Sequence, residues 1–163
     1  MVAFFEMVGG QALAFIGFAL AVGLCCIGSA KGTGMVGEAA TGVLSETPEH
    51  FTKCMILQAL PGTQGLYGLA AGFFGLFTLG FFSGSPAQLT VGDGMAILFA
   101  CVPIMLGGLL SAIAQGRVAA ASVSAIVGKK PDDYMKGVIM CGIVEFYAIL
   151  SLVGTILMLM YAL

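Results

Sequence analysis

Four long apolar segments alternate with three short polar stretches along the 163-residue chain. Each polar stretch contains a proline, and the three read SETPEH (45–50), SGSPAQ (83–88) and GKKPDD (128–133). They leave apolar segments near 9–44, 49–82, 87–127 and 132–162. Each segment exceeds the roughly 20 residues that a helix needs to cross about 30 Å of hydrocarbon, whereas open strands leave unpaired backbone groups in lipid. The pattern predicts an all-α membrane protein with four transmembrane helices.

The two halves of the chain repeat each other. Aligning Pro48 with Pro131 sets an offset of 83 residues and brings SETPEHFTKCMI opposite GKKPDDYMKGVI, with a proline, an acid, an aromatic residue and a lysine in register. Upstream, GSAKG (28–32) faces AIAQG (112–116) after a shift of one residue. Such self-similarity indicates a duplicated helical hairpin. We expect a first hairpin over residues 1–84, without a membrane carboxylate, and a second over residues 85–163 that carries Glu145.

The composition agrees with a membrane location. Hydrophobic residues make up 60% of the chain and charged residues 9%, and the mean hydropathy is +1.09. A soluble domain carries about a quarter of its residues as charged ones. The formal net charge of −2 gives no support for nucleic-acid binding, and Lys31 and Arg117 form no basic cluster. Five cysteines lie scattered in apolar runs without a disulfide or zinc spacing.

Lysines mark one side of the predicted membrane domain. They flank the two repeated loops at Lys53, Lys129, Lys130 and Lys136. Residues 1–10, 83–94 and 160–163 hold no lysine or arginine. Because positive charge gathers on the cytoplasmic side, we expect a multi-pass protein of the cell membrane. Its loops 45–50 and 128–133 should be cytoplasmic and its termini outside.

Small residues in the first segment indicate close helix packing. Gly28 and Gly32 have the small-xxx-small spacing that lets helix backbones approach each other in membranes. The N-terminal apolar run also lacks the positive region of a signal peptide. We therefore interpret it as a transmembrane helix in a crowded position, either within a ring of packed hairpins or within one bundle.

Glu145 lies deep in the last apolar segment, within VIMCGIVEFYAIL. It follows Pro131 by 14 residues, which is about 21 Å along a helix that rises about 1.5 Å per residue. A charge at that depth costs at least about 2.5–3.5 kcal/mol, so an ionisable residue there is by default functional. The alternative is a protonated structural glutamate that pairs with a neighbouring helix. The repeat places Gly62 at the matching position, so we expect one ion site per four helices.

The second apolar segment contains a polar interruption, ALPGTQGLYG, at residues 59–68. Leu60, Thr63, Gln64 and Tyr67 follow i, i+3, i+4 and i+7 and therefore share one helix stripe. Pro61 lacks an N–H group and clashes with the carbonyl four residues back, so the helix should loosen and offer backbone oxygen. Irregular backbone at membrane depth is tolerated where it is buried or lines a site.

Gln64 and Gln115 fall at the same depth as Glu145. Gln64 follows Pro48 by 16 residues on a helix that runs in the same direction, and Gln115 precedes Val127 by 12 residues on a returning helix. Oxygen ligands such as carbonyl, hydroxyl, amide and carboxylate groups suit hard cations. The alternative is that these polar groups simply bond neighbouring helices.

Four motifs resemble the rotor-ring proteolipid, the K or c subunit, of bacterial V-type ATPases. They read LPGTQGLYG, IGSAKGTG, SAIAQGRVAAA and VEFYAIL, and the resemblance covers essentially the whole chain. It implies identical subunits in a lipid-embedded ring whose ions bind at the essential glutamate and pass an arginine of a stator membrane subunit. Central-stalk subunits should contact the cytoplasmic loops. The chain has no GxxxxGK[ST] motif, so ATP hydrolysis should belong to partner subunits and the chain is no enzyme by itself.

The resemblance to the sodium-translocating type of this family also implies a ligand set and no organic cofactor. The implied Na⁺ ligands are the carbonyl of Leu60 and the side chains of Thr63, Gln64, Gln115 and Glu145, with Tyr67 holding the carboxylate. Phe146 departs from the family pattern, in which a threonine is expected after the glutamate. This departure bears on the local shape of the site.

Other functions compete with a sodium-carrying rotor. The first alternative is the same rotor protein with H⁺ as its ion, because a carboxylate in apolar surroundings readily takes up a proton. The surplus of oxygens around Glu145 favours Na⁺. A free-standing proton-coupled exporter would want a substrate cavity with aromatic residues, yet the chain has no tryptophan. A purely structural proteolipid or pore would not need Glu145 with convergent oxygens.

Overall fold

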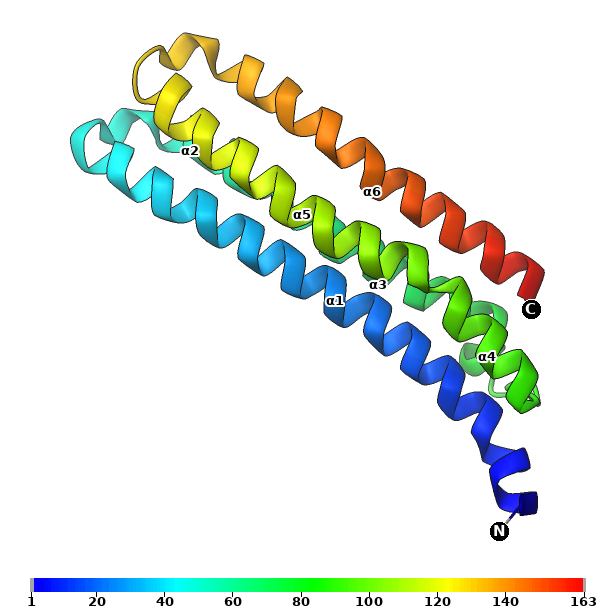
Figure 1. Ribbon diagram of the computed structural model, residues 1–163. Coiled ribbons are helices and arrows are strands. Elements are labelled where there is room, and N and C mark those ends of the chain that lie inside the picture. Colours follow the sequence, from blue (N-terminus) through cyan, green and yellow to red (C-terminus); the bar gives the residue numbers. More distant parts are fainter. Residues whose placement is uncertain (1, 163) are drawn as a thin grey trace.

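The computed structural model describes residues 2–162, with side chains from residue 8 onward, and its regular elements are all helical. They are α1 (Val2–Glu46), α2 (Phe51–Ala59), α3 (Thr63–Thr78), α4 (Val91–Ala100), α5 (Val102–Ser122) and α6 (Tyr134–Ala162). The helices run side by side as a bundle, with the two repeated loops at one end (Figure 1). The first turns of α1 and the last turns of α6 lie toward the other end (Figure 1). The prediction of an all-α fold is confirmed.

Three stretches of the described residues are long and apolar enough to cross a membrane, at Val8–Glu46, Val91–Val127 and Pro131–Ala162. The second expected segment, 49–82, is not among them, because it divides into α2 with 9 residues and α3 with 16 residues, joined by a 3₁₀ turn over Leu60–Gly62. Pro61 explains the division because it cannot donate to the Leu57 carbonyl and its ring crowds that group. Each piece alone is shorter than a membrane-spanning helix.

The third apolar segment differs from its expected course in three places. Hydropathy places residues 87–90 within the helix, but they lie outside it, because Thr90 caps α4. The Thr90 hydroxyl accepts the Asp93 N–H, and the Asp93 carboxylate accepts the Thr90 N–H in return. The helix is interrupted again at Cys101, close to Pro103, which cannot continue the hydrogen-bond ladder. After α5, the chain widens into a π-helical turn over Val123–Val127.

Helix α1 packs most extensively against α5, and glycines set the distance between the two helices. A Cβ atom on Gly28 would lie 2.6 Å from the carbonyl oxygen of Leu109. One on Gly32 would lie 2.5 Å from the carbonyl oxygen of Ala112. Residues with a side chain could not occupy these positions without moving α5. The close approach predicted from the Gly28 and Gly32 spacing is confirmed.

The apolar core is divided into two clusters along the bundle. The terminal cluster contains Ile97 and lies toward the chain ends, and the loop cluster contains Leu57 and lies toward the repeated loops. Tyr67 packs against the terminal cluster, whereas Leu60 packs against the loop cluster. The polar interruption in the second segment therefore spans the junction between the two clusters.

The two repeated loops share one backbone conformation. Thr47, with φ −134° and ψ 73°, precedes a 3₁₀ turn over Pro48–His50. Lys130, with φ −142° and ψ 71°, precedes a 3₁₀ turn over Pro131–Asp133. The two prolines are 83 residues apart, which is the offset found in the sequence. The repeat in the sequence is thus also a repeat in local structure at these loops.

Candidate ion-binding site

The 3₁₀ turn in the middle of the second segment brings two oxygens together. The Leu60 carbonyl accepts the backbone N–H of Thr63 and also its hydroxyl, at an Oγ1–O distance of 2.9 Å. The hydroxyl proton therefore points at the carbonyl, which leaves the lone pairs of the Thr63 oxygen available. The loosening predicted around Pro61 is present, although the Leu60 carbonyl is shared with Thr63 rather than vacant.

Two buried amides meet at this level of the bundle. Gln64 of α3 and Gln115 of α5 are both 0% exposed, and Nε2 of Gln64 donates to Oε1 of Gln115 at 2.7 Å. The other amide atom of Gln64, Oε1, is buried and has no hydrogen-bond partner among the residues that the structure describes. Buried polar atoms are nearly always paired, since leaving one unpaired costs about 1–3 kcal/mol. The described residues therefore leave the Gln64 oxygen without the partner that a buried polar atom normally has.

Hydrogen bonds from two other helices orient the carboxylate of Glu145. Tyr67 of α3 donates to Oε1 at 2.5 Å, and Nε2 of Gln115 donates to Oε2 over a longer 3.4 Å. The same Gln115 nitrogen donates to the Cys141 carbonyl at 2.9 Å, one turn before Glu145 on α6. A chain of hydrogen bonds thus runs from Gln64 through Gln115 to the carboxylate. The prediction that these groups share one depth is confirmed.

The carboxylate lies at the edge of the packed bundle rather than inside it. Glu145 is partly exposed, and the residues that follow it, Phe146 and Tyr147, are 58% and 65% exposed. The amides of Gln64 and Gln115 are fully buried behind it. Groups outside the chain can therefore reach the carboxylate on one side while the fixed amides hold the other side.

The sequence analysis missed two contacts in this region. The Cys141 carbonyl, which accepts from Gln115, could have been suspected because it lies four residues before Glu145 on a helix. The Ser29 hydroxyl of α1 accepts the backbone N–H of Gly65 at 2.9 Å, just beyond Gln64. The sequence holds no signal for this second contact, because it depends on how α1 is turned toward α3.

The surface of the bundle also holds two grooves that contain none of these residues. Lys31 and Arg117, which are far apart in the sequence, line one groove with Glu38 between α1 and α5. The three side chains are exposed. Helix packing thus brings Lys31 and Arg117 to the same surface, but with Glu38 between them the groove is not a basic cluster.

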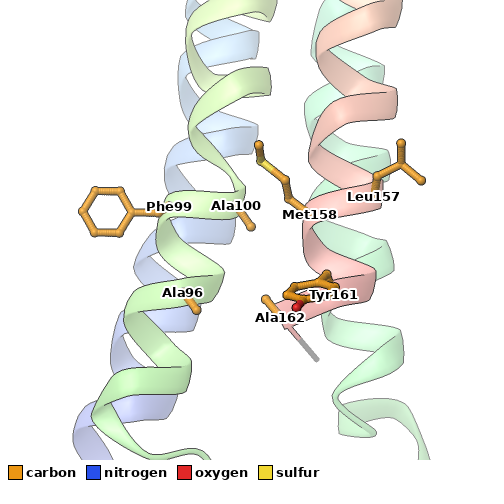
Figure 2. A pocket seen from close by; sticks show the side chains of 7 residues that line it. All are labelled: Ala96, Phe99, Ala100, Leu157, Met158, Tyr161 and Ala162. Carbon is orange, nitrogen blue, oxygen red and sulfur yellow. The ribbon is translucent and has the colours of Figure 1, made fainter.

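A groove of about 700 Å³ lies between α4 and the last turns of α6. It is lined by Ala96, Phe99, Ala100, Leu157, Met158, Tyr161 and Ala162. Figure 2 shows Ala100 and Met158 pointing into the gap between the two helices and Phe99 pointing away from it. Tyr161 is the polar member of this lining. The groove thus has neither a carboxylate nor an amide side chain with which to bind an ion.

The donor set around Glu145 suits a monovalent hard cation. Among the residues that the structure describes, no three His, Cys, Asp or Glu side chains come together. Tyr67 and Gln115 contact the one carboxylate of Glu145, and the neutral oxygens of Leu60, Thr63 and Gln64 lie on the stretch of the second segment just before Tyr67. Neutral oxygens replace the water of a hard cation, and one carboxylate balances one positive charge.

Known proteins match this chain over most of its length. The sequence pattern of the ATP synthase C-subunit family matches residues 16–74 and again residues 98–158. The chain is 44% identical over 154 residues to the V-type sodium ATPase subunit K of Enterococcus hirae, which covers 94% of each protein. It is 36% identical over 153 residues to the A-type ATP synthase subunit K of Methanocaldococcus jannaschii, covering 94% of this chain and 64% of that protein.

Proposed function

Because the chain belongs to the ATP synthase C-subunit family, we propose that it is the ion-binding rotor-ring subunit of a V-type ATPase and carries Na⁺ at Glu145. It is a non-catalytic membrane subunit, and partner subunits hydrolyse the ATP. Family membership favours this function over a free-standing exporter. The relative from Enterococcus hirae is named a sodium ATPase subunit, which favours Na⁺ over H⁺.

The proposal includes four transmembrane segments in two hairpins, over residues 1–84 and 85–163. The second of these segments is the broken helix formed by α2, the 3₁₀ turn and α3, from Phe51 to Thr78. At about 1.5 Å per residue it is about 40 Å long, more than the roughly 30 Å of hydrocarbon. The matched loop turns and the two separate family matches support the division into hairpins.

The observation that carries the Na⁺ proposal is the unpartnered buried oxygen of Gln64. In the proposed site, this Oε1 atom binds Na⁺ together with the Glu145 carboxylate. The Leu60 carbonyl, the Thr63 hydroxyl and the Gln115 amide complete the set of oxygens. Tyr67 is not a ligand and instead fixes the direction of the carboxylate.

A site that held only a proton would need fewer polar groups. A protonated carboxyl needs one acceptor for its proton, and a proton alone gives no reason to gather the further buried oxygens of Leu60, Thr63, Gln64 and Gln115 at the same depth. A bare sodium ion requires several oxygens, because it must regain the interactions that it loses with water. The surplus at this depth is therefore better matched to Na⁺.

Ion release follows from the position of Glu145 at the edge of the bundle. In a ring of identical subunits, the exposed face of α6 meets lipid, neighbouring copies and, during rotation, the stator membrane subunit. An arginine of the stator would compete with Na⁺ for the carboxylate, since each can balance its charge. The buried amides stay in place during this exchange and receive the next ion. The loops 45–50 and 128–133 would face the cytoplasm and contact the central stalk.

Sodium protection of purified rings tests the proposal. A carboxyl-reactive carbodiimide modifies a protonated carboxyl group, so bound Na⁺ at Glu145 should suppress labelling. We expect millimolar Na⁺ to suppress it near neutral pH, and K⁺ at the same concentration to do so poorly. Equal labelling with and without Na⁺ would contradict the sodium site and favour a rotor that carries H⁺.

Glu145→Gln provides the control for the labelling site. The amide is neutral and nearly the same size, so the ring should still assemble while the label disappears. Ion-coupled ATPase activity of the complete complex should be lost. Coupled transport at the wild-type rate in this variant would contradict the role of Glu145.

A further inference from the structure

The first turn of α3 is capped by a side chain from a different helix. Gly65 is the third residue of α3, so its N–H group is among those that lack a helical partner four residues back. The residue at the N-cap, Gly62, has no side chain to supply a bond. The Ser29 hydroxyl of α1 accepts the Gly65 N–H instead, at 2.9 Å and across 36 residues of sequence.

Local features of both helices permit this contact. Ser29 is buried at 8% exposure and lies between Gly28 and Gly32, where α1 comes close to its neighbours. A Cβ atom on Gly32 would lie 2.7 Å from Cβ of Pro61, so α1 rests directly on the break in the second segment. A Cβ atom on Gly65 would lie 3.4 Å from the Ser29 oxygen. The contact is thus part of a closely packed junction.

We infer that Ser29 is a positioning residue that holds the broken helix in the geometry required for Na⁺ binding. This inference rests on the proposed function and assigns a further residue to the same site. The hydrogen bond of the Ser29 hydroxyl goes to the Gly65 N–H and not to a proposed ligand atom. Ser29 acts through Gly65, which directly follows Gln64 and lies two residues after Thr63.

The effect of losing this bond follows from helix geometry. Without the Ser29 oxygen, the acceptor that an α-helix would offer the Gly65 N–H is the Pro61 carbonyl, four residues back. Taking that bond would turn the 3₁₀ turn into α-helix, and the two forms differ by about 20° of rotation per residue. Thr63 and Gln64 would then point in a different direction relative to Glu145. A loss of Na⁺ affinity is expected even though every ligand is still present.

The test compares two buried serines in assembled rings. Ser29→Ala removes the cap, whereas Ser122→Ala removes a hydroxyl that is 4% exposed and bonds the Val118 carbonyl of its own helix. The readout is the Na⁺ concentration that halves carbodiimide labelling of Glu145. We expect it to rise about tenfold in Ser29→Ala, as for the loss of one hydrogen bond. It should change by less than about twofold in Ser122→Ala, as usual for sites with separate partners.

Amide hydrogen exchange gives a second readout that does not depend on Na⁺. The Gly65 amide should exchange about tenfold faster in Ser29→Ala than in the wild type, because it loses its acceptor. If the alanine variant fails to assemble, Ser29→Cys replaces the oxygen by a weaker acceptor of similar size and is measured in the same way.

The outcomes separate this inference from the proposed function. If Na⁺ protects the wild-type ring and the half-protecting Na⁺ concentration is the same in the Ser29 variant, Ser29 does not have the inferred role. The proposed function as a sodium rotor would be unaffected by that result. A wild-type ring without sodium protection would contradict the proposed function itself. Equal weakening in Ser29→Ala and Ser122→Ala would also overturn the inference, because it would show a general loss of packing.

Discussion

Tyr67 donates a hydrogen bond to Oε1 of Glu145 at 2.5 Å, although the two residues are 78 positions apart in the chain. Gln115 approaches the other carboxylate oxygen, so each oxygen has a donor from a different helix. The carboxylate is therefore oriented before any ion arrives, which lowers the ordering cost of binding. This arrangement leads to the first prediction.

Tyr67→Phe should weaken Na⁺ binding without preventing ring assembly. The phenyl ring keeps its packing against the terminal cluster, whereas the carboxylate loses one of its two donors. We expect the half-protecting Na⁺ concentration in the labelling assay to rise about five- to tenfold. An unchanged sodium titration in an assembled Tyr67→Phe ring would show that this bond does not support the site.

Thr63→Val combined with Gln115→Leu should reduce sodium protection further while leaving labelling of Glu145 intact. The replacements are similar in size, but they remove a hydroxyl and an amide from the proposed ligand set. We expect the half-protecting Na⁺ concentration to rise by more than about tenfold. Thr78→Val is the matched control, because its hydroxyl bonds the Phe74 carbonyl near the end of α3. Equal sodium titrations for the double variant and the control would argue against the ligand assignment.

Cysteines introduced at Glu49 and Asp132 should react with a membrane-impermeant maleimide from the cytoplasmic side alone. The basic residues beside both loops favour that orientation. The Asp132 side chain is fully exposed despite its ion pair with Lys53 at 3.3 Å. Exposed Cys26 should first be replaced by serine to remove background reaction. If the maleimide modified the introduced cysteines when added outside intact cells, the topology would be the reverse of the proposed one.

Gly32→Val should destabilise the protein, because the new side chain would collide with the Ala112 carbonyl and with Pro61. Overpacking of this kind costs roughly 1–3 kcal/mol. We expect a lower melting temperature and a smaller yield of assembled rings. Gly34→Val is the control within the same helix, since a Cβ atom there meets nothing within 4 Å. Equal melting temperatures for the two variants would contradict the close-packing role of Gly32.

The depth of the site residues could be predicted because the rise of a helix is constant. Counting from Pro48 and Pro131 was enough to place Gln64 beside Glu145 in height. The position of Tyr67 followed from its spacing on the same stripe. The sequence could not show which atoms would pair, because that depends on the rotation of each helix about its axis. The unpartnered Gln64 oxygen and the Ser29 contact therefore required the structure.

The sequence predicted the boundaries of the helices less well than it predicted the fold class. The four apolar segments and the helix break at Pro61 were readable from hydropathy and one proline. The start of α4 at Val91 was missed, although Thr90 and Asp93 form a capping pair visible in the sequence. Hydropathy is insensitive to such pairs because it averages over many residues. For the same reason, hydropathy does not reveal the interruption of the third segment near Pro103.

The glycine in the 3₁₀ turn of the second segment has an energetic consequence for the proposed machine. Gly62 stands where the repeat places Glu145 in the other half of the chain, so the two proposed hairpins would share one exchangeable charge. A ring of given circumference then moves about half as many ions per revolution as one with a carboxylate in every hairpin. Moving one charge against 100 mV costs about 2.3 kcal/mol. The energy of each revolution is divided among fewer ions, so each ion can be driven against an electrochemical gradient about twice as large. The missing carboxylate thus lowers the number of ions moved per ATP and raises the gradient that the pump can sustain.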